Sequence, residues 1–317
     1  MYFRATLILL ALFLIPIGGT QWRQNHRAQA ATPSPIHLNV TVTDKSGALV
    51  KGLQADHFEI SVAKKPARVV SFSDADSPVS VGIVFDSSGS MQSGSDNATR
   101  KNFFVLREAL RRFLELNNES NEYFLLGFNV KPQLLIDWTS DRTKLNDNFD
   151  HLNVFGNSAF YDACYLAVDK LQRGRHAKRV LILISDGEDN VSRYTFVELR
   201  ELLKNSGVIL YAINFPREVD AGSSVGMEGR GVLEELSSLT GGVAIYSTAG
   251  RSLRFSDAQT VFERIANELR HQYAISIVTD EPNNSQKWRK IKVRIKPPTN
   301  ASKNFNQLTA RTRAGFY

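Results

Sequence analysis

The chain contains very little cysteine, and its histidines are dispersed. A single cysteine, Cys164, among 317 residues excludes an intramolecular disulfide and a cysteine-based metal cluster. Cys164 falls in an apolar helical stretch, where we expect it to be a buried small hydrophobic residue. The six histidines show no metal-ligand spacing, so the sequence does not support a zinc site.

The chain also lacks a strong excess of charge. Lys plus Arg number 39 and Asp plus Glu number 32, for a net charge of +7. Arg4, Arg23 and Arg27 lie in the first thirty residues, which hold no acid, and this leaves +4 for the rest of the chain. Such a mild excess does not argue for a nucleic-acid partner. Hydrophobic residues make up 42%, which is enough for a sizeable core and excludes wholesale disorder.

Long hydrophobic runs are absent after the first thirty residues, so we expect no later membrane span. The apolar run from Leu7 to Ile15 is short, follows the cationic Arg4 and precedes an A-x-A site at Ala28-Gln29-Ala30. This pattern predicts a signal peptide over residues 1–30, cleaved before Ala31, that exports the chain to the periplasm, the cell surface or the medium. An uncleaved N-terminal membrane anchor is the alternative.

Two kinds of pattern divide the remaining chain. Residues 36–76 alternate apolar and polar side chains, which predicts an N-terminal β segment. From Val79 to His271, apolar strands alternate with amphipathic helices. We expect strands at Val79–Phe85, Arg179–Ser185, Val208–Phe215 and Val243–Tyr246, a hairpin of Tyr123–Asn129 with Gln133–Trp138, and helices at Asn102–Leu116, Ala159–Leu171, Thr195–Lys204, Gly231–Leu239 and Phe255–His271.

This alternation predicts an α/β fold with a doubly wound, mostly parallel sheet and helices on both faces. The glycine-rich segment from Arg217 to Arg230 is interpreted as a loop after a strand. In residues 272–297 we expect a second hairpin, of Tyr273–Val278 with Trp288–Ile295, which pairs with the N-terminal β segment to form a small β domain. Residues 298–317 form a tail.

Oxygen-bearing side chains follow the ends of the predicted strands. The strand at Val79–Phe85 leads into Asp86-x-Ser88-x-Ser90, Ser158 precedes a helix, and Asp186 follows the strand at Arg179–Ser185. The carboxyl ends of parallel strands meet at one edge of a sheet, where ligands bind. Two carboxylates with several hydroxyls, and no His or Cys, describe a site for a hard cation, of which Mg²⁺ is expected and Mn²⁺ or Ca²⁺ is possible. Alternatively, the serines act only as helix N-caps.

These residues resemble a known family. Asp86-x-Ser88-x-Ser90, the segment from Gly156 to Ala163, and Ile184-Ser185-Asp186-Gly187 are similar to the three loops of the von Willebrand factor type A domain. The resemblance covers roughly Val79 to His271 and implies a Rossmann-like fold with a metal-ion-dependent adhesion site. It implies that Asp86, Ser88, Ser90, Ser158 and Asp186 are the metal ligands. Ser158 stands where the family usually has Thr, which keeps the hydroxyl but lacks the stiffening β-branch.

The chain ends add to this resemblance. The predicted export signal, and the Val-x-Val-x-Asp-x-x-Gly pattern from Val40 to Gly47, are similar to exported bacterial proteins that carry a domain related to von Willebrand factor A. The resemblance implies a non-enzymatic binding module whose metal captures a carboxylate of a protein partner. The alternative is a structural or assembly component of a cell-envelope complex, in which the metal only braces the loops.

An enzymatic function is not expected. A phosphotransferase with Asp86 as nucleophile would need a second carboxylate two residues later, where Ser88 stands.

Two further groups of charges have both a structural and a functional interpretation. Glu188, Asp189 and Asp162 form a solvated acidic rim, or else Glu188 and Asp189 tune the field of the metal loops or take a second ion, while Asp162 favours the dipole of the helix that it begins. The basic face of Trp288–Lys296 is solvated or contacts an anionic surface of the cell envelope.

Overall fold

The structure is a computed structural model that describes residues 34–92, 96–148, 154–214, 223–246, 255–279, 287–296 and 308–317. These ranges belong to one compact unit, Pro33–Tyr317. The predicted signal peptide lies outside the described residues. Among the helices that are described, none combines the length and the apolar character needed to cross a membrane.

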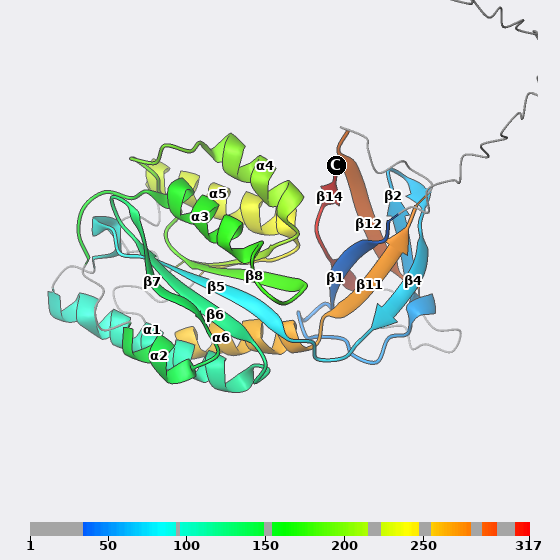
Figure 1. The fold of residues 1–317 in the computed structure, drawn as a ribbon, viewed down its shortest axis with the longest axis horizontal. Coiled ribbons are helices and arrows are strands. Elements are labelled where there is room, and N and C mark those ends of the chain that lie inside the picture. The colour runs from blue at the N-terminus through cyan, green and yellow to red at the C-terminus, as the bar shows by residue number, and fades with distance from the viewer. Residues whose placement is uncertain are drawn as a thin grey trace, which may run out of the picture. The chain divides into compact units, whose positions relative to one another are not determined.

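A six-stranded sheet forms the centre of the α/β part (Figure 1). Its strand order is β10-β9-β8-β5-β6-β7. All neighbouring pairs are parallel except β6 and β7, which form the predicted antiparallel hairpin. The strands are β5 (Val79–Asp86), β6 (Glu122–Phe128), β7 (Pro132–Thr139), β8 (Lys178–Ile184), β9 (Ile209–Asn214) and β10 (Ala244–Tyr246). The predicted mostly parallel sheet is confirmed.

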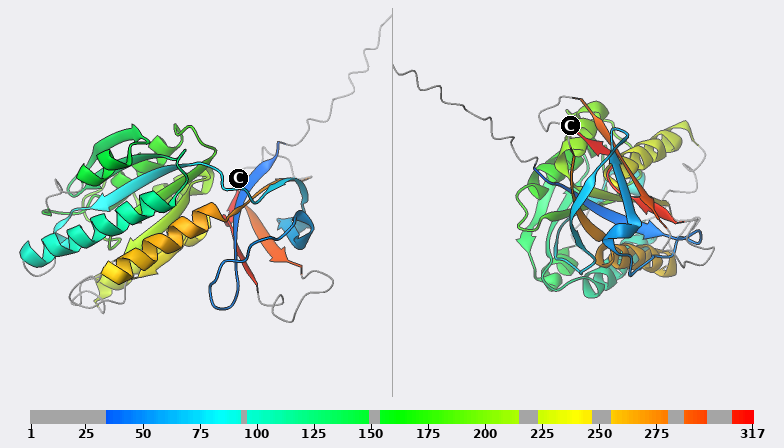
Figure 2. Two further views of the ribbon diagram at one scale, coloured as in Figure 1. Left: turned by 90° about the horizontal axis from the view of Figure 1, so that it is seen from below. Right: turned by 90° about the vertical axis from the view of Figure 1, so that its right-hand side faces the viewer.

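Helices cover both faces of this sheet, as predicted (Figures 1 and 2). The helices are α1 (Asp96–Leu116), α2 (Arg142–Asp147), α3 (Phe160–Leu171), α4 (Phe196–Ser206), α5 (Ser224–Thr240) and α6 (Phe255–Arg270). Because side chains alternate across a strand, Ile83 packs into the core under α1 and α6, whereas Val84 packs into the core under α3, α4 and α5. Every residue of β5 is buried, which makes it the central strand.

Local sequence signals fix the ends of α4. Thr195 Oγ1 accepts a hydrogen bond from Glu198 N at 3.3 Å, and the Glu198 carboxylate accepts one from Thr195 N at 2.8 Å. This reciprocal capping satisfies backbone donors that the first turn leaves free. Gly207 then ends the helix with a φ of 67°, a left-handed conformation that suits glycine.

The chain ends build two antiparallel four-stranded sheets around a shared hydrophobic core. The first has the order β13-β1-β11-β4 and the second β14-β12-β2-β3. Their strands are β1 (Ile36–Thr43), β2 (Phe58–Val62), β3 (Lys65–Pro66), β4 (Arg68–Ser73), β11 (Tyr273–Val278), β12 (Arg289–Ile295), β13 (Thr309–Arg311) and β14 (Gly315–Phe316). Part of the predicted tail therefore forms β13 and β14.

The predicted hairpin of β11 with β12 is wrong. Both strands exist, but β11 pairs with β1 and β4, whereas β12 pairs with β2 and β14. The two segments thus lie in different sheets, and each pairs with strands of the N-terminal β segment. Residues 280–286, between the two strands, lie outside the described residues. The hairpin was expected because the two segments are close in sequence. In the structure, each strand instead buries its apolar side chains in the shared core by pairing with strands that are distant in the chain.

The predicted loop from Arg217 to Arg230 is wrong from Ser224 onward. Residues 215–222 lie outside the described residues, but α5 already begins at Ser224 and includes Gly226 and Gly229. The glycines made a helix improbable on propensity alone. Gly229 is required by packing instead, because a Cβ there would lie 2.5 Å from the carbonyl oxygen of Asp186. The tertiary contact therefore overrides local propensity.

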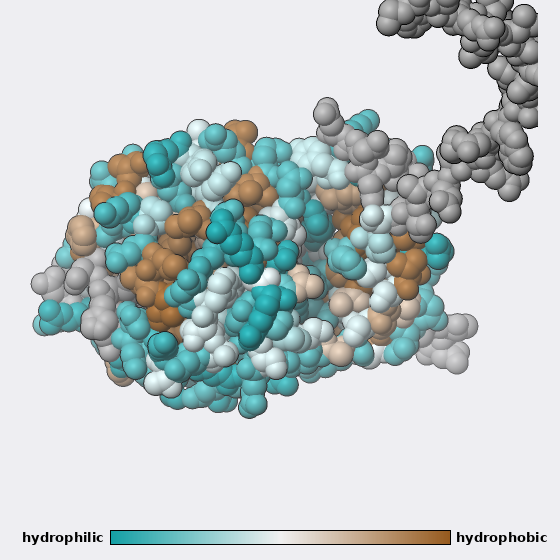
Figure 3. All heavy atoms as spheres, viewed as in Figure 1, coloured by the Kyte–Doolittle hydropathy of each residue, from teal (hydrophilic) through white to brown (hydrophobic). Residues whose placement is uncertain are grey.

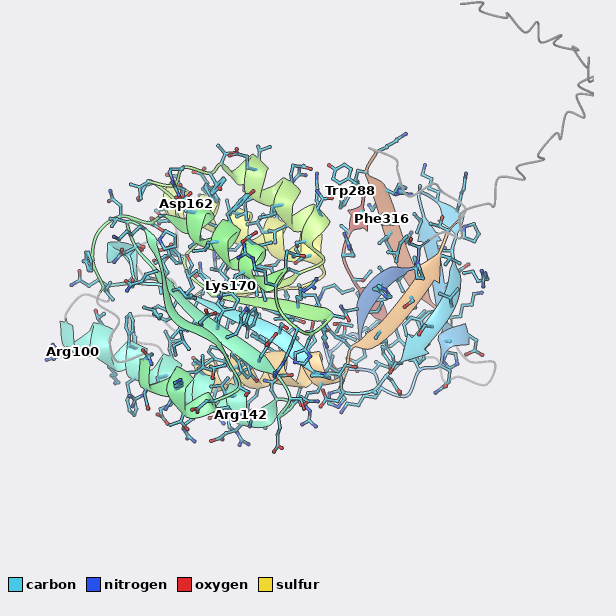
Figure 4. The ribbon with its side chains drawn as sticks, viewed as in Figure 1. Arg100, Arg142, Asp162, Lys170, Trp288 and Phe316 are labelled. Carbon is cyan, nitrogen blue, oxygen red and sulfur yellow. The ribbon has the colours of Figure 1, made fainter. Side chains whose placement is uncertain are left out.

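The basic strand β12 has the predicted two faces. Arg289 and Ile291 are buried, whereas Lys290, Lys292 and Arg294 are exposed. Figure 4 labels Trp288 just before this strand and Phe316 on the paired strand β14. The exposed cations thus lie on one face of the β14-β12-β2-β3 sheet.

A buried polar network ties α6 to the β sheets. The Oε1 atom of Glu268, a residue only 3% exposed, accepts hydrogen bonds from Tyr211 Oη at 2.6 Å and Thr41 Oγ1 at 3.0 Å. Arg311 on β13 donates to the same oxygen and to the carbonyl of Gly241. One carboxylate thus joins α6, β9, β1 and β13.

Candidate metal centre

Asp86 is the last residue of β5, and its side chain is fully buried. Its Oδ1 accepts a hydrogen bond from the backbone N–H of Ser88 at 2.9 Å. Its Oδ2 accepts one from Ser185 Oγ at 2.7 Å. Ser185 directly follows β8, which pairs in parallel with β5. The sheet therefore brings the first and third predicted loops together at the carboxylate of Asp86.

The first loop continues with two serines that face each other. The Oγ atoms of Ser88 and Ser90 lie 2.9 Å apart, and Ser88 is 1% exposed. A short 3₁₀ helix, Gly89–Met91, begins here, but the side chain of Ser88 makes no capping hydrogen bond to it. The N-cap interpretation therefore does not account for Ser88.

Ser158 lies in the second loop, just before α3. Its backbone N–H donates to Asn190 Oδ1 at 2.8 Å, and its carbonyl accepts from Asn190 N at 3.0 Å. The side chain is buried, and Ser158 Oγ has no hydrogen-bond partner among the described residues. The N-cap position of α3 belongs to Ala159, so Ser158 does not cap this helix either. A buried hydroxyl without a partner is costly unless another group binds it.

Backbone hydrogen bonds join the first and second loops directly. Gly89 N donates to the carbonyl of Gly156 at 2.8 Å, and Phe155 N donates to the carbonyl of Ser87 at 3.0 Å. Gly156 has a φ of 76°, which favours glycine at this position. The structure therefore holds the Asp86, Ser88, Ser90 and Ser158 segments in one assembly.

Asp186 completes the set from the third loop. Its Oδ1 accepts a hydrogen bond from Glu188 N at 3.0 Å, and its backbone carbonyl accepts one from Asn214 Nδ2 at 3.3 Å. Burial, together with the negative charge of Asp186, raises the pKa of Asp86 to about 7. The two carboxylates are thus close enough to repel each other. A divalent cation beside them would offset both the burial and this repulsion.

Two residues of the predicted acidic rim, Asp162 and Asp189, have carboxylates that accept hydrogen bonds from protein groups. Asp162, at the start of α3 (Figure 4), accepts hydrogen bonds from the backbone N–H groups of Arg193 at 2.9 Å and Tyr194 at 3.0 Å. Asp189 Oδ1 accepts from Tyr161 N at 3.1 Å and from Ser192 Oγ at 2.5 Å. These carboxylates fix the segment after the third loop to the start of α3. Their role is to position the loops.

Sequence reasoning assigned no role to Ser185 or Asn190. Ser185 orients Asp86, and its Oγ accepts from Gly187 N at 3.0 Å. Asn190 holds the backbone of Ser158 in place. A serine directly before Asp186, at the end of a fully buried strand, was the available signal for Ser185. No comparable pattern marked Asn190, because its contact depends on how the loop folds back.

The oxygen set fits a hard cation. It holds two carboxylates, Asp86 and Asp186, with the hydroxyls of Ser88, Ser90 and Ser158. In the part of the chain that the structure describes, no three His, Cys, Asp or Glu side chains cluster as metal ligands. The partnerless Oγ of Ser158 is the feature that a cation, or water bound to it, would satisfy.

Comparison with known proteins finds one family that matches part of the chain. The von Willebrand factor type A domain family matches residues 81–188. No curated protein matches the chain. Among solved structures, the von Willebrand factor type A protein from Catenulispora acidiphila is 12% identical, with a TM-score of 0.47, over 86% of this chain and 72% of its own.

Two other structures are each similar over 60% of this chain. The von Willebrand factor domain of the type V pili tip protein Mfa5 from Porphyromonas gingivalis is 14% identical, with a TM-score of 0.47, over 60% of this chain and 94% of its own. The protein BatB from Bacteroides thetaiotaomicron is 15% identical, with a TM-score of 0.46, over 60% of this chain and 98% of its own. The family match, over residues 81–188, spans the segments that hold Asp86, Ser88, Ser90, Ser158 and Asp186.

Proposed function

We propose that the protein is an exported, metal-dependent binding module that captures an acidic group of a protein partner. Asp86, Ser88, Ser90, Ser158 and Asp186 would hold a divalent cation, with Mg²⁺ as the expected ion. The bound cation supplies a hard Lewis acid that accepts a carboxylate oxygen from the partner. The proposal includes export through the predicted signal peptide, to the periplasm, the cell surface or the medium.

The observation that carries this proposal is the buried Oγ of Ser158 without a partner. A side chain that only builds the fold would be expected to find a hydrogen bond, as Ser185 and Asp162 do. The neighbouring loops supply four further oxygen ligands. Other buried polar atoms, such as Ser237 Oγ, also lack a partner among the described residues, so it is the place of Ser158 in the loop tied to the Asp86 loop that supports a role in ion binding.

The loop-to-loop hydrogen bonds weigh against the bracing alternative. Gly89 with Gly156, Ser87 with Phe155, and Asp86 with Ser185 are joined by protein atoms alone. Loops that are already tied to one another do not need a cation to hold them. An ion at this place would instead be free to bind an external ligand.

The test is capture of a partner from the native cell envelope by the full-length protein, in Mg²⁺ and in excess EDTA. We expect a partner that is retained in Mg²⁺ and released by EDTA. The Ser158→Ala variant removes a hydroxyl without a partner, so it should keep the stability of the metal-free protein while it weakens capture. The Asp86→Ala variant should abolish capture. Partner binding that is unchanged in EDTA and in both variants would show that the proposal is wrong.

A further inference from the structure

Helix α3 begins directly after Ser158, and its N-cap residue does not cap its first turn. This residue is Ala159, which has no side-chain oxygen, and its ψ of 57° departs from the extended conformation that is usual at the N-cap. The first turn of an α-helix leaves backbone N–H groups that need partners from elsewhere. The partners in α3 come from another loop.

Side chains of the third loop accept two of these N–H groups. Tyr161 N donates to Asp189 Oδ1 at 3.1 Å, and Asp162 N donates to Ser192 Oγ at 3.0 Å. Ser192 Oγ in turn donates to the same oxygen of Asp189 at 2.5 Å, so the two acceptors hold each other in place. A carboxylate at this position also interacts favourably with the helix dipole. Asp189 and Ser192 thus take the place of a local N-cap.

The same loop holds Ser158 through its backbone alone. The N–H of Ser158 donates to Asn190 Oδ1 at 2.8 Å, and its carbonyl accepts from Asn190 N at 3.0 Å and from Val191 N at 3.3 Å. Its buried Oγ has no hydrogen-bond partner in the part of the chain that the structure describes. The third loop therefore fixes the main chain of Ser158 and leaves its hydroxyl available to an ion.

The third loop carries a candidate ligand as well as these contacts. Asp186 lies three residues before Asp189. The far end of the segment is fixed to α3 by Asp162 (Figure 4), whose Oδ1 accepts from Tyr194 N at 3.0 Å, and by the rings of Tyr165 and Tyr194, which stack with centroids 3.8 Å apart. Because one segment carries Asp186 and also holds Ser158, the positions of these two candidate ligands are linked.

Packing holds the body of α3 on the sheet. Phe160, Cys164 and Leu171, on its inner side, are buried in the core. Its outer side lies at the surface, where Figure 3 shows hydrophobic side chains over α3 and β7, and Leu166 is 41% exposed. The buried side chains should keep α3 in place when one contact from the third loop is removed. Variants of this loop therefore test the position of Ser158 rather than the fold.

We propose that Asp189, Asn190 and Ser192 are positioning residues that fix Ser158 for the ion and make the centre prefer Mg²⁺ to Ca²⁺. They act through the backbone of Ser158 and the first turn of α3. Mg²⁺ demands nearly octahedral oxygens at about 2.0–2.1 Å, whereas Ca²⁺ accepts oxygens at about 2.3–2.6 Å in a flexible geometry. A displaced Ser158 therefore weakens Mg²⁺ binding more than Ca²⁺ binding. This inference rests on the proposed function, because it assumes the ion site.

Calorimetric titration of Mg²⁺ and of Ca²⁺ into the full-length protein tests it. Asp189→Ala and Asn190→Ala each remove one positioning side chain. We expect each variant to bind Mg²⁺ about tenfold more weakly than the wild type. We expect Ca²⁺ binding to weaken by less than about threefold. Asp189→Asn keeps an oxygen that accepts both hydrogen bonds but removes the charge, so it should bind Mg²⁺ within about twofold of the wild type.

The matched control is Asp141→Ala. Asp141 caps α2, since its Oδ1 accepts from Thr143 N at 3.0 Å and from Lys144 N at 3.3 Å. Helix α2 follows β7, whose last residue, Thr139, pairs with Tyr123 near the start of β6. This cap therefore lies at the end of the sheet opposite the candidate metal centre. Asp141→Ala should lower the melting temperature, as the loss of a cap does, and leave the affinity for both ions unchanged.

A second readout does not depend on the ion. In the metal-free protein, amide hydrogen exchange of the segment 158–163, measured by mass spectrometry, should be faster in Asp189→Ala than in the wild type. The reason is that Tyr161 N loses its acceptor. The same segment should exchange at the wild-type rate in Asp141→Ala. Unchanged exchange in Asp189→Ala would contradict the capping of α3 by the third loop.

The outcomes separate the two proposals. Affinities for Mg²⁺ and Ca²⁺ that are the same in the wild type and in Asp189→Ala overturn the positioning role and leave the proposed function standing. Equal losses for both ions, with the same loss in Asp189→Asn, mean that Asp189 acts through its charge, which also overturns the inference. If the wild type binds neither ion, the proposed function is wrong and the inference falls with it.

Discussion

Ser185 Oγ donates a 2.7 Å hydrogen bond to Oδ2 of Asp86, across the ends of two neighbouring parallel strands. The same Oγ accepts from Gly187 N, so one buried hydroxyl links the first and third loops. We predict that Ser185→Ala lowers the free energy of unfolding by about 1–3 kcal/mol, because it leaves a buried carboxylate oxygen and a buried N–H without partners. Urea unfolding in Mg²⁺ and in EDTA measures this.

The matched control is Ser224→Ala, at an exposed position in α5, which should change stability by less than about 0.5 kcal/mol. Equal stability of the two variants would mean that the hydroxyl of Ser185 does not support Asp86.

Glu268 gives a prediction about how the β sheets hold the α/β part. Its Oε1 is the common acceptor for Thr41, Tyr211 and Arg311. Replacement of Glu268 by Leu removes the acceptor of the Arg311 guanidinium and of two hydroxyls. We therefore expect the free energy of unfolding to fall by about 3–5 kcal/mol. Denaturant unfolding of the wild type and Glu268→Leu measures it.

The double variant Glu268→Leu with Arg311→Leu separates pairing from packing. Because it removes both charges, it should be more stable than Glu268→Leu alone. A double variant that is less stable than the single one would contradict a paired role for these residues.

Lys178 predicts a pH dependence of stability. Its Nζ donates to the carbonyl of Leu269, and burial lowers the pKa of Lys178 from 10.5 to about 8. Between these values the unfolded chain binds more protons than the folded protein, so the contribution of Lys178 to stability rises with pH. The difference in unfolding free energy between the wild type and Lys178→Met should therefore increase by up to about 3 kcal/mol from pH 8 to pH 10.5.

Below pH 8 the same difference should be flat, because Lys178 is then protonated in both states. A Lys178 difference that stays constant up to pH 10.5 would contradict the lowered pKa.

Cys164 should be chemically silent in the folded protein. Its side chain is fully buried in α3, and burial raises the pKa of the thiol well above its ordinary value. Because the thiolate is the reactive form, we predict no reaction with Ellman's reagent in native buffer and one thiol per chain in guanidinium chloride. Rapid reaction of the native protein would place Cys164 at the surface.

The α/β part could be predicted because its strands carry strong local signals. Buried parallel strands are nearly continuous apolar runs, and both Val79–Asp86 and Lys178–Ile184 have that character. Because ligands gather at the carboxyl ends of such strands, the sequence also predicts Asp86 and Asp186 at one edge of the sheet. In the structure, hydrogen bonds join the loop of Asp86 to the loop that precedes Ser158 and to Ser185, directly before Asp186.

The pairing of the outer strands could not be predicted in this way. An alternating pattern tells which face of Tyr273–Val278 is buried, but not which strand lies beside it. Its partners, β1 and β4, are about two hundred residues away in the chain and share no sequence signal with it. The helical position of Gly229 could not be predicted for a similar reason. The contact that requires a glycine there is made with Asp186, in another loop.

The central claim is that one divalent cation binds where Asp86, Ser158 and Asp186 meet, and calorimetric titration of Mg²⁺ into the full-length protein tests it most directly. We predict one ion per chain for the wild type, weaker binding for Ser158→Ala with unchanged stability of the metal-free protein, and no binding for Asp86→Ala. An absence of heat with Mg²⁺, Mn²⁺ and Ca²⁺ alike, or equal binding by all three proteins, would contradict the account.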